Sequence, residues 1–311
     1  MQPDLTTVQD ILLDATRALG AVMEFHEARL QAELLLAHAL ETTRALLLAR
    51  LSETVAPDAA ARYAANVARR AQHEPLAYIT GHQEFYGLDL LVDCRVLIPR
   101  HETETLVVLA LQRIQRVPHA APVIVDVGTG SGALVLALAR HLPHARIYAT
   151  DVSPDALAVA RINAARLRLE SRVVFLQGDL LAPVTEAFDL LVSNLPYIPS
   201  ARFDQLPREI RGFEPRVALD GGADGLAVMR RLVAQIETHA ARGAVGFLEI
   251  SEEQGKAAVE LFQRQFPRAT VVLHQDLEGM DRAVEIRIQE TERVQADFGL
   301  LDGDGIPSDC C

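Results

Sequence analysis

The chain has 311 residues, half of them hydrophobic, so it can form one large domain or two ordinary domains with a substantial core. Its apolar runs stay well short of the ~20 residues that a membrane helix needs. The formal net charge of −12 argues against a tight binder of free nucleic acid, which usually carries a basic surface. These properties favour a soluble protein that acts on another protein or on a small molecule.

The N-terminal sequence and the cysteines indicate a cytoplasmic protein. The start, MQPDLTTVQD, lacks the basic and apolar segments of a secretory signal. Cys94, Cys310 and Cys311 show none of the spacings typical of a zinc site or of a disulfide framework. We predict a monomer without a metal ion and with no membrane or direct nucleic-acid partner.

Residues 1–76 are predicted to form a small helical bundle. Four helices are expected. Thr7 can cap the first, the second covers 28–40, the third covers TRALLLARL (43–51), and Pro57 can open the fourth. The predicted inward face of the second helix carries Leu30, Leu34 and Ala37. Because this region shows no catalytic pattern, we interpret it as a domain that docks the substrate.

Residues 77–100 alternate around Gly87 and predict a β-hairpin that links the bundle to a second domain over 101–288. The last segment, 289–311, carries Gly, Asp and Ser without periodicity. We predict that it is a disordered tail.

Strands and helices alternate through the second domain. Strands are expected at 123–128, 146–151, 173–179, 188–194, 244–250, 270–277 and 282–288. Helices are expected at 131–141, 154–168, 225–240 and 252–265. This alternation predicts an α/β domain whose mostly parallel sheet is covered on both faces. Only a short loop joins the last two strands, so they must pair antiparallel. Seven strands ending in such a hairpin form the Rossmann-like architecture of class I methyltransferases.

A glycine-rich turn follows the first of these strands, in the segment VDVGTGSGA. Its glycines allow a tight turn and a close approach to a ligand at the carboxyl ends of the strands. The predicted cofactor-binding residues of this turn are Gly128, Thr129, Gly130, Ser131 and Gly132. The turn alone is equally compatible with a dinucleotide.

Acidic residues near this turn favour S-adenosylmethionine over NAD. Asp126 is expected near the ammonium group of the ligand, and it would repel the pyrophosphate of NAD. Asp151, at the end of the second strand, can accept hydrogen bonds from both ribose hydroxyls. Asp179 or Leu180, after the third strand, can contact the adenine.

The fourth strand leads into Asn194, Leu195, Pro196 and Tyr197. A planar amide or amine nitrogen must become more tetrahedral before it attacks a methyl sulfonium. The side-chain oxygen of Asn194 and the carbonyl of Leu195, which Pro196 restricts, can accept its two N–H groups. Tyr197 offers a flat face for stacking. The motif therefore predicts transfer to nitrogen through positioning and fixed dipoles.

The order of these motifs resembles that of the HemK/PrmC family, the release-factor glutamine N5-methyltransferases, over about residues 5–288. The matching segments are PLAYITGHQEFYGL, LIPRHETETLV, VDVGTGSGA, SNLPYIPS, FEPRVALDGGADGL, LEISEEQG and DLEGMDR. The resemblance implies that S-adenosylmethionine is the cofactor. It implies that the substrate is the glutamine of the Gly-Gly-Gln loop in class 1 peptide chain release factors. It also implies that residues 128–132, Asp151 and Asn194 contact the cofactor and that residues 194–197 hold the glutamine amide.

Three positions depart from the family pattern, because Leu195, His101 and Ser251 stand where the family usually has proline, proline and glycine. We expect the change at Leu195 to be tolerated, since a backbone carbonyl acts there. His101 is interpreted as a surface turn residue rather than a general base.

Four further residues are candidates for the substrate site: Arg100, Glu102, Glu214 and Arg216. Arg100 and Glu102 shape the substrate cleft or simply begin a helix. The loop at 213–222 is expected to fold over the site, where Glu214 and Arg216 pair with each other or contact the substrate.

Other functions stay open at this point. A sister family methylates glutamine in a large-subunit ribosomal protein, although the stretch RHETE (100–104) favours the release-factor branch. A DNA adenine N6-methyltransferase would use the same N-x-P-Y motif, but the acidic charge argues against it. A fold that has lost activity is disfavoured by the intact Asp126, Asp151 and Asn194.

Overall fold

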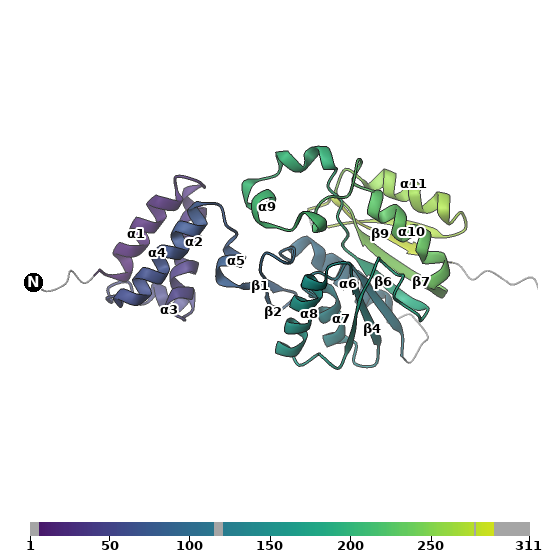
Figure 1. Ribbon diagram of the computed structural model, residues 1–311, viewed down its shortest axis with the longest axis horizontal. Helices are drawn as coiled ribbons and strands as arrows, with labels where there is room; N and C mark the ends of the chain where they lie inside the picture. The colour runs from purple at the N-terminus through teal and green to yellow at the C-terminus, as the bar shows by residue number, and fades with distance from the viewer. Residues whose placement is uncertain (1–5, 115–120, 277, 289–311) are drawn as a thin grey trace, which may run out of the picture.

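The computed structural model describes residues 6–114, 121–276 and 278–288. A helical bundle at the N-terminal end lies beside a larger α/β part (Figure 1). None of the described helices is long and apolar enough to span a membrane. The predicted tail at 289–311, with Cys310 and Cys311, lies outside the described residues.

The N-terminal bundle has its own hydrophobic core. Its helices are α1 (Val8–Leu19), α2 (Phe25–Ala39), α3 (Arg44–Leu48) and α4 (Pro57–Ala71). The predicted cap of α1 is confirmed: the Thr7 hydroxyl accepts from the Asp10 amide at 3.3 Å, and the Asp10 carboxylate accepts from the Thr7 amide at 3.1 Å. Pro57 occupies the first turn of α4, as predicted.

The predicted inward face of α2 is confirmed only in part, because Ala37 is buried but Leu34 is half-buried and Leu30 is 42% exposed. The buried face also carries Ala28, Ala32, Leu35, Leu36 and Ala39. Small side chains on this face let the neighbouring helices approach closely, and the Tyr63 hydroxyl of α4 donates to the Ala32 carbonyl at 3.1 Å.

The predicted hairpin is shorter than residues 77–100. A short helix, α5 (Leu76–Thr80), precedes β1 (His82–Phe85) and β2 (Leu88–Leu91). The turn at Gly87 is confirmed, with φ of 49° at Tyr86 and 73° at Gly87, the geometry of a type I′ turn. Residues 92–100 form no strand and run toward the cavity described below.

The seven-stranded sheet confirms the predicted architecture. Its strands are β3 (Val123–Val127), β4 (Arg146–Asp151), β5 (Val173–Gln177), β6 (Phe188–Ser193), β7 (Ala240–Glu249), β8 (Thr270–Gln275) and β9 (Asp281–Arg287). Their order is β5-β4-β3-β6-β7-β9-β8. Strand β9 is antiparallel to both β7 and β8, so the final hairpin inserts its second strand and leaves β8 at the edge.

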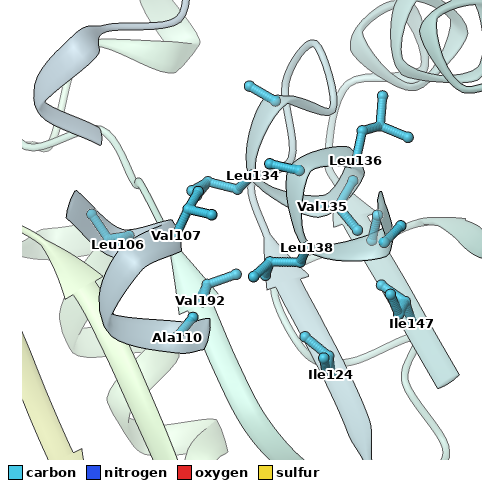
Figure 2. Close-up of a cluster of buried hydrophobic side chains, with 14 of the residues drawn as sticks. Leu106, Val107, Ala110, Ile124, Leu134, Val135, Leu136, Leu138, Ile147 and Val192 are labelled. Atoms are coloured by element: carbon cyan, nitrogen blue, oxygen red, sulfur yellow. The ribbon is translucent and has the colours of Figure 1, made fainter. Parts of the chain in front are cut away.

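Helices cover both faces of the sheet (Figure 1). One face is covered by α6 (Glu104–Ile114), α7 (Ala133–His141) and α8 (Pro154–Arg166). The other is covered by α10 (Ala227–His239) and α11 (Gly255–Gln265). Figure 2 shows the first interface, where Leu106, Val107 and Ala110 of α6 meet α7 above Val192 of the sheet.

The long connection after β6 contains η2 (Ser200–Gln205), α9 (Arg208–Phe213) and η3 (Arg216–Ala218). It reaches back to the bundle, because the buried guanidinium of Arg70 at the end of α4 pairs with Glu209 of α9 at 2.8 Å. This ion pair joins the bundle to a segment that lines the cavity.

Candidate active site

A cavity of about 310 Å³ lies at the carboxyl ends of β3, β4 and β6. Its volume is in the range of small-molecule sites. Its wall includes the glycine turn after β3, the end of β4, the residues after β6 and the strip at 95–100. In an open α/β sheet this edge is where ligands bind.

The glycine turn forms the floor of the cavity. Gly130 has a φ of 55°, a conformation that other residues rarely adopt, and its amide donates to Oδ2 of Asp151 at 2.9 Å. A side chain at Gly132 would lie 3.1 Å from Leu136 and 3.3 Å from Ala160. The turn therefore needs glycine for its backbone conformation at Gly130 and for helix packing at Gly132.

Asp151 stands at the tip of β4 on the cavity wall, where the sequence placed it. Its carboxylate accepts from the amides of Gly130 and Ser153, both at 2.9 Å. Burial raises the pKa of Asp151, and these backbone hydrogen bonds oppose the shift. A carboxylate has about four acceptor positions, so Asp151 can still accept from a ligand.

Asp126 differs from its predicted contact with a ligand. It is fully buried in β3 and does not line the cavity. The Thr129 hydroxyl donates to its Oδ2 at 2.7 Å. Burial raises the pKa of Asp126 to about 7, against the hydrogen bond from Thr129. Asp126 is therefore connected to the cavity wall through Thr129, which lines it.

Asp179 and Leu180 line the opposite end of the cavity, after β5. Asp179 forms an ion pair with Arg231 of α10, which lines the same end. The sequence reasoning did not identify Arg231, since its helix is distant in the chain.

Asn194, Leu195 and Pro196 line the cavity beside the glycine turn. Val127 pairs with Ser193 in neighbouring parallel strands, which brings Gly128 level with Asn194. The side-chain Nδ2 of Asn194 donates to the Thr103 hydroxyl at 3.0 Å, which leaves its Oδ1 available to a ligand. The Leu195 side chain is buried against Gly128.

Tyr197 lies behind this wall. Its hydroxyl donates to Oε1 of Glu249 at 3.3 Å, and its carbonyl accepts from Nε2 of Gln254 at 3.0 Å. Burial and the nearby Glu249 raise the pKa of Tyr197. Tyr197 is absent from the described cavity wall, so the predicted stacking role stays a prediction.

Of the four further substrate candidates, only Arg100 lines the cavity. Arg100 pairs with the buried Glu214, which also accepts from the Ile98 amide at 3.3 Å. Arg216 pairs with Asp220 at 2.9 Å, so the pairing with Glu214, one of its two expected roles, is not formed. Glu102 is exposed. The pairing of Arg100 with Glu214 was missed because 114 residues separate them.

Comparisons with known proteins agree with this geometry. The PrmC N-terminal domain family matches residues 10–81, and a methyltransferase domain family matches residues 118–219. A release factor glutamine methyltransferase from Moorella thermoacetica is 46% identical over 89% of this chain and 96% of its own length. The chain belongs to the release factor glutamine methyltransferase family. A second family member, from Geobacter sulfurreducens, is 41% identical over 92% of this chain and 99% of its own length.

A solved structure supports the fold alone. The hMettl16 catalytic domain, in complex with the MAT2A 3′UTR hairpin 6, superposes with a TM-score of 0.52 at 14% identity, over 75% of this chain and 82% of that one. The class I methyltransferase domain of this chain implies the use of S-adenosylmethionine.

Two residues of this chain, Thr103 and Glu249, were not assigned a role from the sequence. Both belong to segments that carry the family resemblance, RHETE and LEISEEQG. The signal was present, but the hydrogen bonds to Asn194 and Tyr197 depend on contacts across 91 and 52 positions.

Proposed function

We propose that the chain transfers a methyl group from S-adenosylmethionine to the side-chain N5 of the glutamine in the Gly-Gly-Gln loop of class 1 peptide chain release factors, in the cytoplasm. The observation that carries the proposal is the amide of Asn194. Its Nδ2 is bound to Thr103, and its Oδ1 is left to accept at the cavity wall. The names of the relatives supply the class of protein substrate.

The chain itself positions the substrate nitrogen. Oδ1 of Asn194 and the carbonyl of Leu195 accept hydrogen bonds from the two N–H groups of the glutamine amide. We call residues 194–197 the amide clamp. These acceptors withdraw the amide from its planar arrangement and direct its lone pair toward the cavity. S-adenosylmethionine, when bound, supplies the methyl group. Pro196 holds Leu195 in the extended conformation that presents its carbonyl.

The residues around the cavity fit this cofactor. The turn at 128–132 offers a backbone cradle, and Asp151 offers acceptor positions for ribose hydroxyls. Leu180 and the pair of Asp179 with Arg231 would border the adenine. Asp126 would support the amino-acid end through Thr129.

Replacing Asp151 by alanine is expected to weaken binding of S-adenosylhomocysteine about 100-fold, because two charge-assisted hydrogen bonds of about 1.5 kcal/mol each are lost. Calorimetric titration measures the change. Asp155→Ala is the matched control, since Asp155 is an exposed acid in the first turn of α8. Equal weakening in both variants would argue against the ribose role of Asp151.

The substrate class is tested with tritiated S-adenosylmethionine and the purified chain. A class 1 release factor, a large-subunit ribosomal protein and duplex DNA are offered separately. We expect label in the release factor and its loss when the Gly-Gly-Gln glutamine is changed. Label only in the ribosomal protein or only in DNA would replace the proposal with the corresponding alternative.

The bundle is proposed to dock the release factor away from the reactive glutamine. Phe25, at the start of α2, is 64% exposed and provides an apolar contact. Phe25→Asp is expected to raise KM about tenfold for whole release factor and to leave KM for a short glutamine peptide unchanged, because about 1.5 kcal/mol of contact is lost. Ile162→Asp, an exposed apolar position on α8, serves as the control. An equal effect on both substrates would contradict docking by this surface.

A further inference from the structure

We infer that Thr103 and Glu249 are positioning residues that fix which end of the Asn194 amide faces the substrate. Thr103 holds Nδ2 of Asn194, and Glu249 holds the hydroxyl of Tyr197 at the other end of the amide clamp. The inference rests on the proposed function, because it explains how the clamp keeps an acceptor aimed at the substrate nitrogen.

The two ends of a carboxamide have almost the same shape and opposite hydrogen-bonding roles. With Oδ1 toward the cavity, Asn194 accepts from the substrate amide. With Nδ2 toward the cavity, the N–H groups of Asn194 would face those of the substrate, and two donors cannot form a hydrogen bond. Activity therefore requires a partner that selects one orientation, and the Thr103 hydroxyl lies 3.0 Å from Nδ2.

A hydroxyl alone does not select this orientation, because it can donate as well as accept. The Thr103 hydroxyl must donate its proton to a third group in order to act only as an acceptor toward Asn194. Glu249 provides that partner. The Thr103 hydroxyl lowers the pKa of Glu249, and Oε2 of Glu249 has no hydrogen-bond partner among the described residues, so this oxygen is free to accept that proton. An ionised carboxylate only accepts, so it draws the protons of both hydroxyls toward itself.

The position of Glu249 suits this role. It ends β7, where Leu248 pairs with Ser193 of β6, so it comes level with Asn194. Its side chain is 1% exposed, and it lies behind the cavity wall rather than on it. Water and substrate therefore do not compete for its oxygens.

The charge state of Glu249 depends on groups from several elements. Burial raises its pKa to about 7, against the hydroxyls of Thr103 and Tyr197 and the positive charge of Arg282 on β9. The negative charge of Glu102 raises it further. The ionised form is present above this pKa and is lost as the pH falls through it. A protonated Glu249 can donate to Thr103, which frees the Thr103 proton to bind Oδ1 of Asn194.

The kinetic test compares three variants at saturating S-adenosylmethionine. Thr103→Val keeps the shape and removes the hydroxyl, and it is expected to lower kcat about 10- to 100-fold with KM and S-adenosylhomocysteine affinity within threefold. Thr103→Ser, which keeps the hydroxyl, is the control and is expected to stay within threefold. Wild-type kcat is expected to fall below about pH 7, and Glu249→Gln is expected to be slow at every pH without that fall.

A second measurement reads the orientation without any substrate. The asparagines of the chain are Asn66, Asn163 and Asn194, so protein labelled with [15N]asparagine gives a side-chain NMR signal for Asn194 that Asn194→Ala identifies. We expect Thr103→Val and acidification through pH 7 to shift this signal and speed its exchange, while the other two signals stay unchanged.

The outcomes separate the two proposals. If wild type methylates no release factor but the Asn194 signal responds as expected, the proposed function fails and the positioning role stands. If wild type is active while Thr103→Val matches Thr103→Ser in kcat, or Glu249→Gln keeps the wild-type pH profile, the positioning role is overturned. An unchanged Asn194 signal in Thr103→Val overturns it as well.

Discussion

Replacing Asn194 by alanine is expected to lower kcat about 100- to 1,000-fold while changing S-adenosylhomocysteine affinity only several-fold. The reason is that Oδ1 accepts from a nitrogen whose acidity rises as the methyl group is transferred. Removing one fixed dipole that is aligned with developing charge typically costs this much in rate. Stopped assays with release factor at saturating substrate measure kcat, and calorimetry measures the affinity.

The control for this variant is Asn66→Ala, which removes an asparagine from α4 of the bundle. Both proteins should show the same cooperative thermal unfolding within a few degrees, since Asn194 is only partly buried. Turnover by Asn194→Ala close to that of wild type would mean that the substrate nitrogen is held by other atoms. The amide clamp would then be wrong.

The fold followed closely from periodicity. Short runs of Val, Ile and Leu between helical patterns fixed the strands to within a few residues, and the start at Thr7 followed from local capping chemistry. Two local errors have physical causes. α2 holds four leucines and four alanines, and close packing of helices buries all four alanines while it leaves Leu30 exposed. The hairpin at 77–100 began too early because Gly81, with a φ of 78°, ends a helix there instead of continuing a strand.

The site was predictable where a single turn carries it and unpredictable where it depends on contacts between distant segments. The glycine turn, Asp151 and residues 194–196 lie around one cavity, as the motif order indicated. The sequence could not show that Asp126 points into the core, that Glu214 belongs to Arg100, or that Asp179 meets Arg231. Each of these depends on the direction of a side chain in the fold or on how segments distant in the chain pack together.

The backbone that follows the 200–218 connection, at 219–225, also braces the amide clamp. Gly225 has a φ of 77°, and a side chain there would place its Cβ 2.1 Å from the Tyr197 carbonyl oxygen and 2.6 Å from Nε2 of Gln254. Atoms do not approach this closely, so the glycine is required by contact as well as by conformation. Tyr197, Gly225 and Gln254 are all absent from the described cavity wall.

Gly225→Ala is therefore expected to displace the clamp and lower kcat about 100-fold, since a shift of about 1 Å at a reacting group costs this much. Stability should fall by about 3 kcal/mol, from about 1–2 kcal/mol of left-handed strain plus a similar cost of overpacking. Urea unfolding measures the stability. Methyl transfer to the release factor measures kcat.

Gly243→Ala distinguishes strain from contact. Gly243 has nearly the same φ, 73°, but a side chain there would meet nothing within 4 Å. In this variant the free energy of unfolding should fall only by the cost of the left-handed conformation, about 1–2 kcal/mol, and turnover should stay at the wild-type level. If both glycine variants lost activity equally, general destabilisation would explain the loss. If Gly225→Ala kept full turnover, the clamp would not depend on the 219–225 backbone, and its geometry would have to be set by β6 and Gln254 alone.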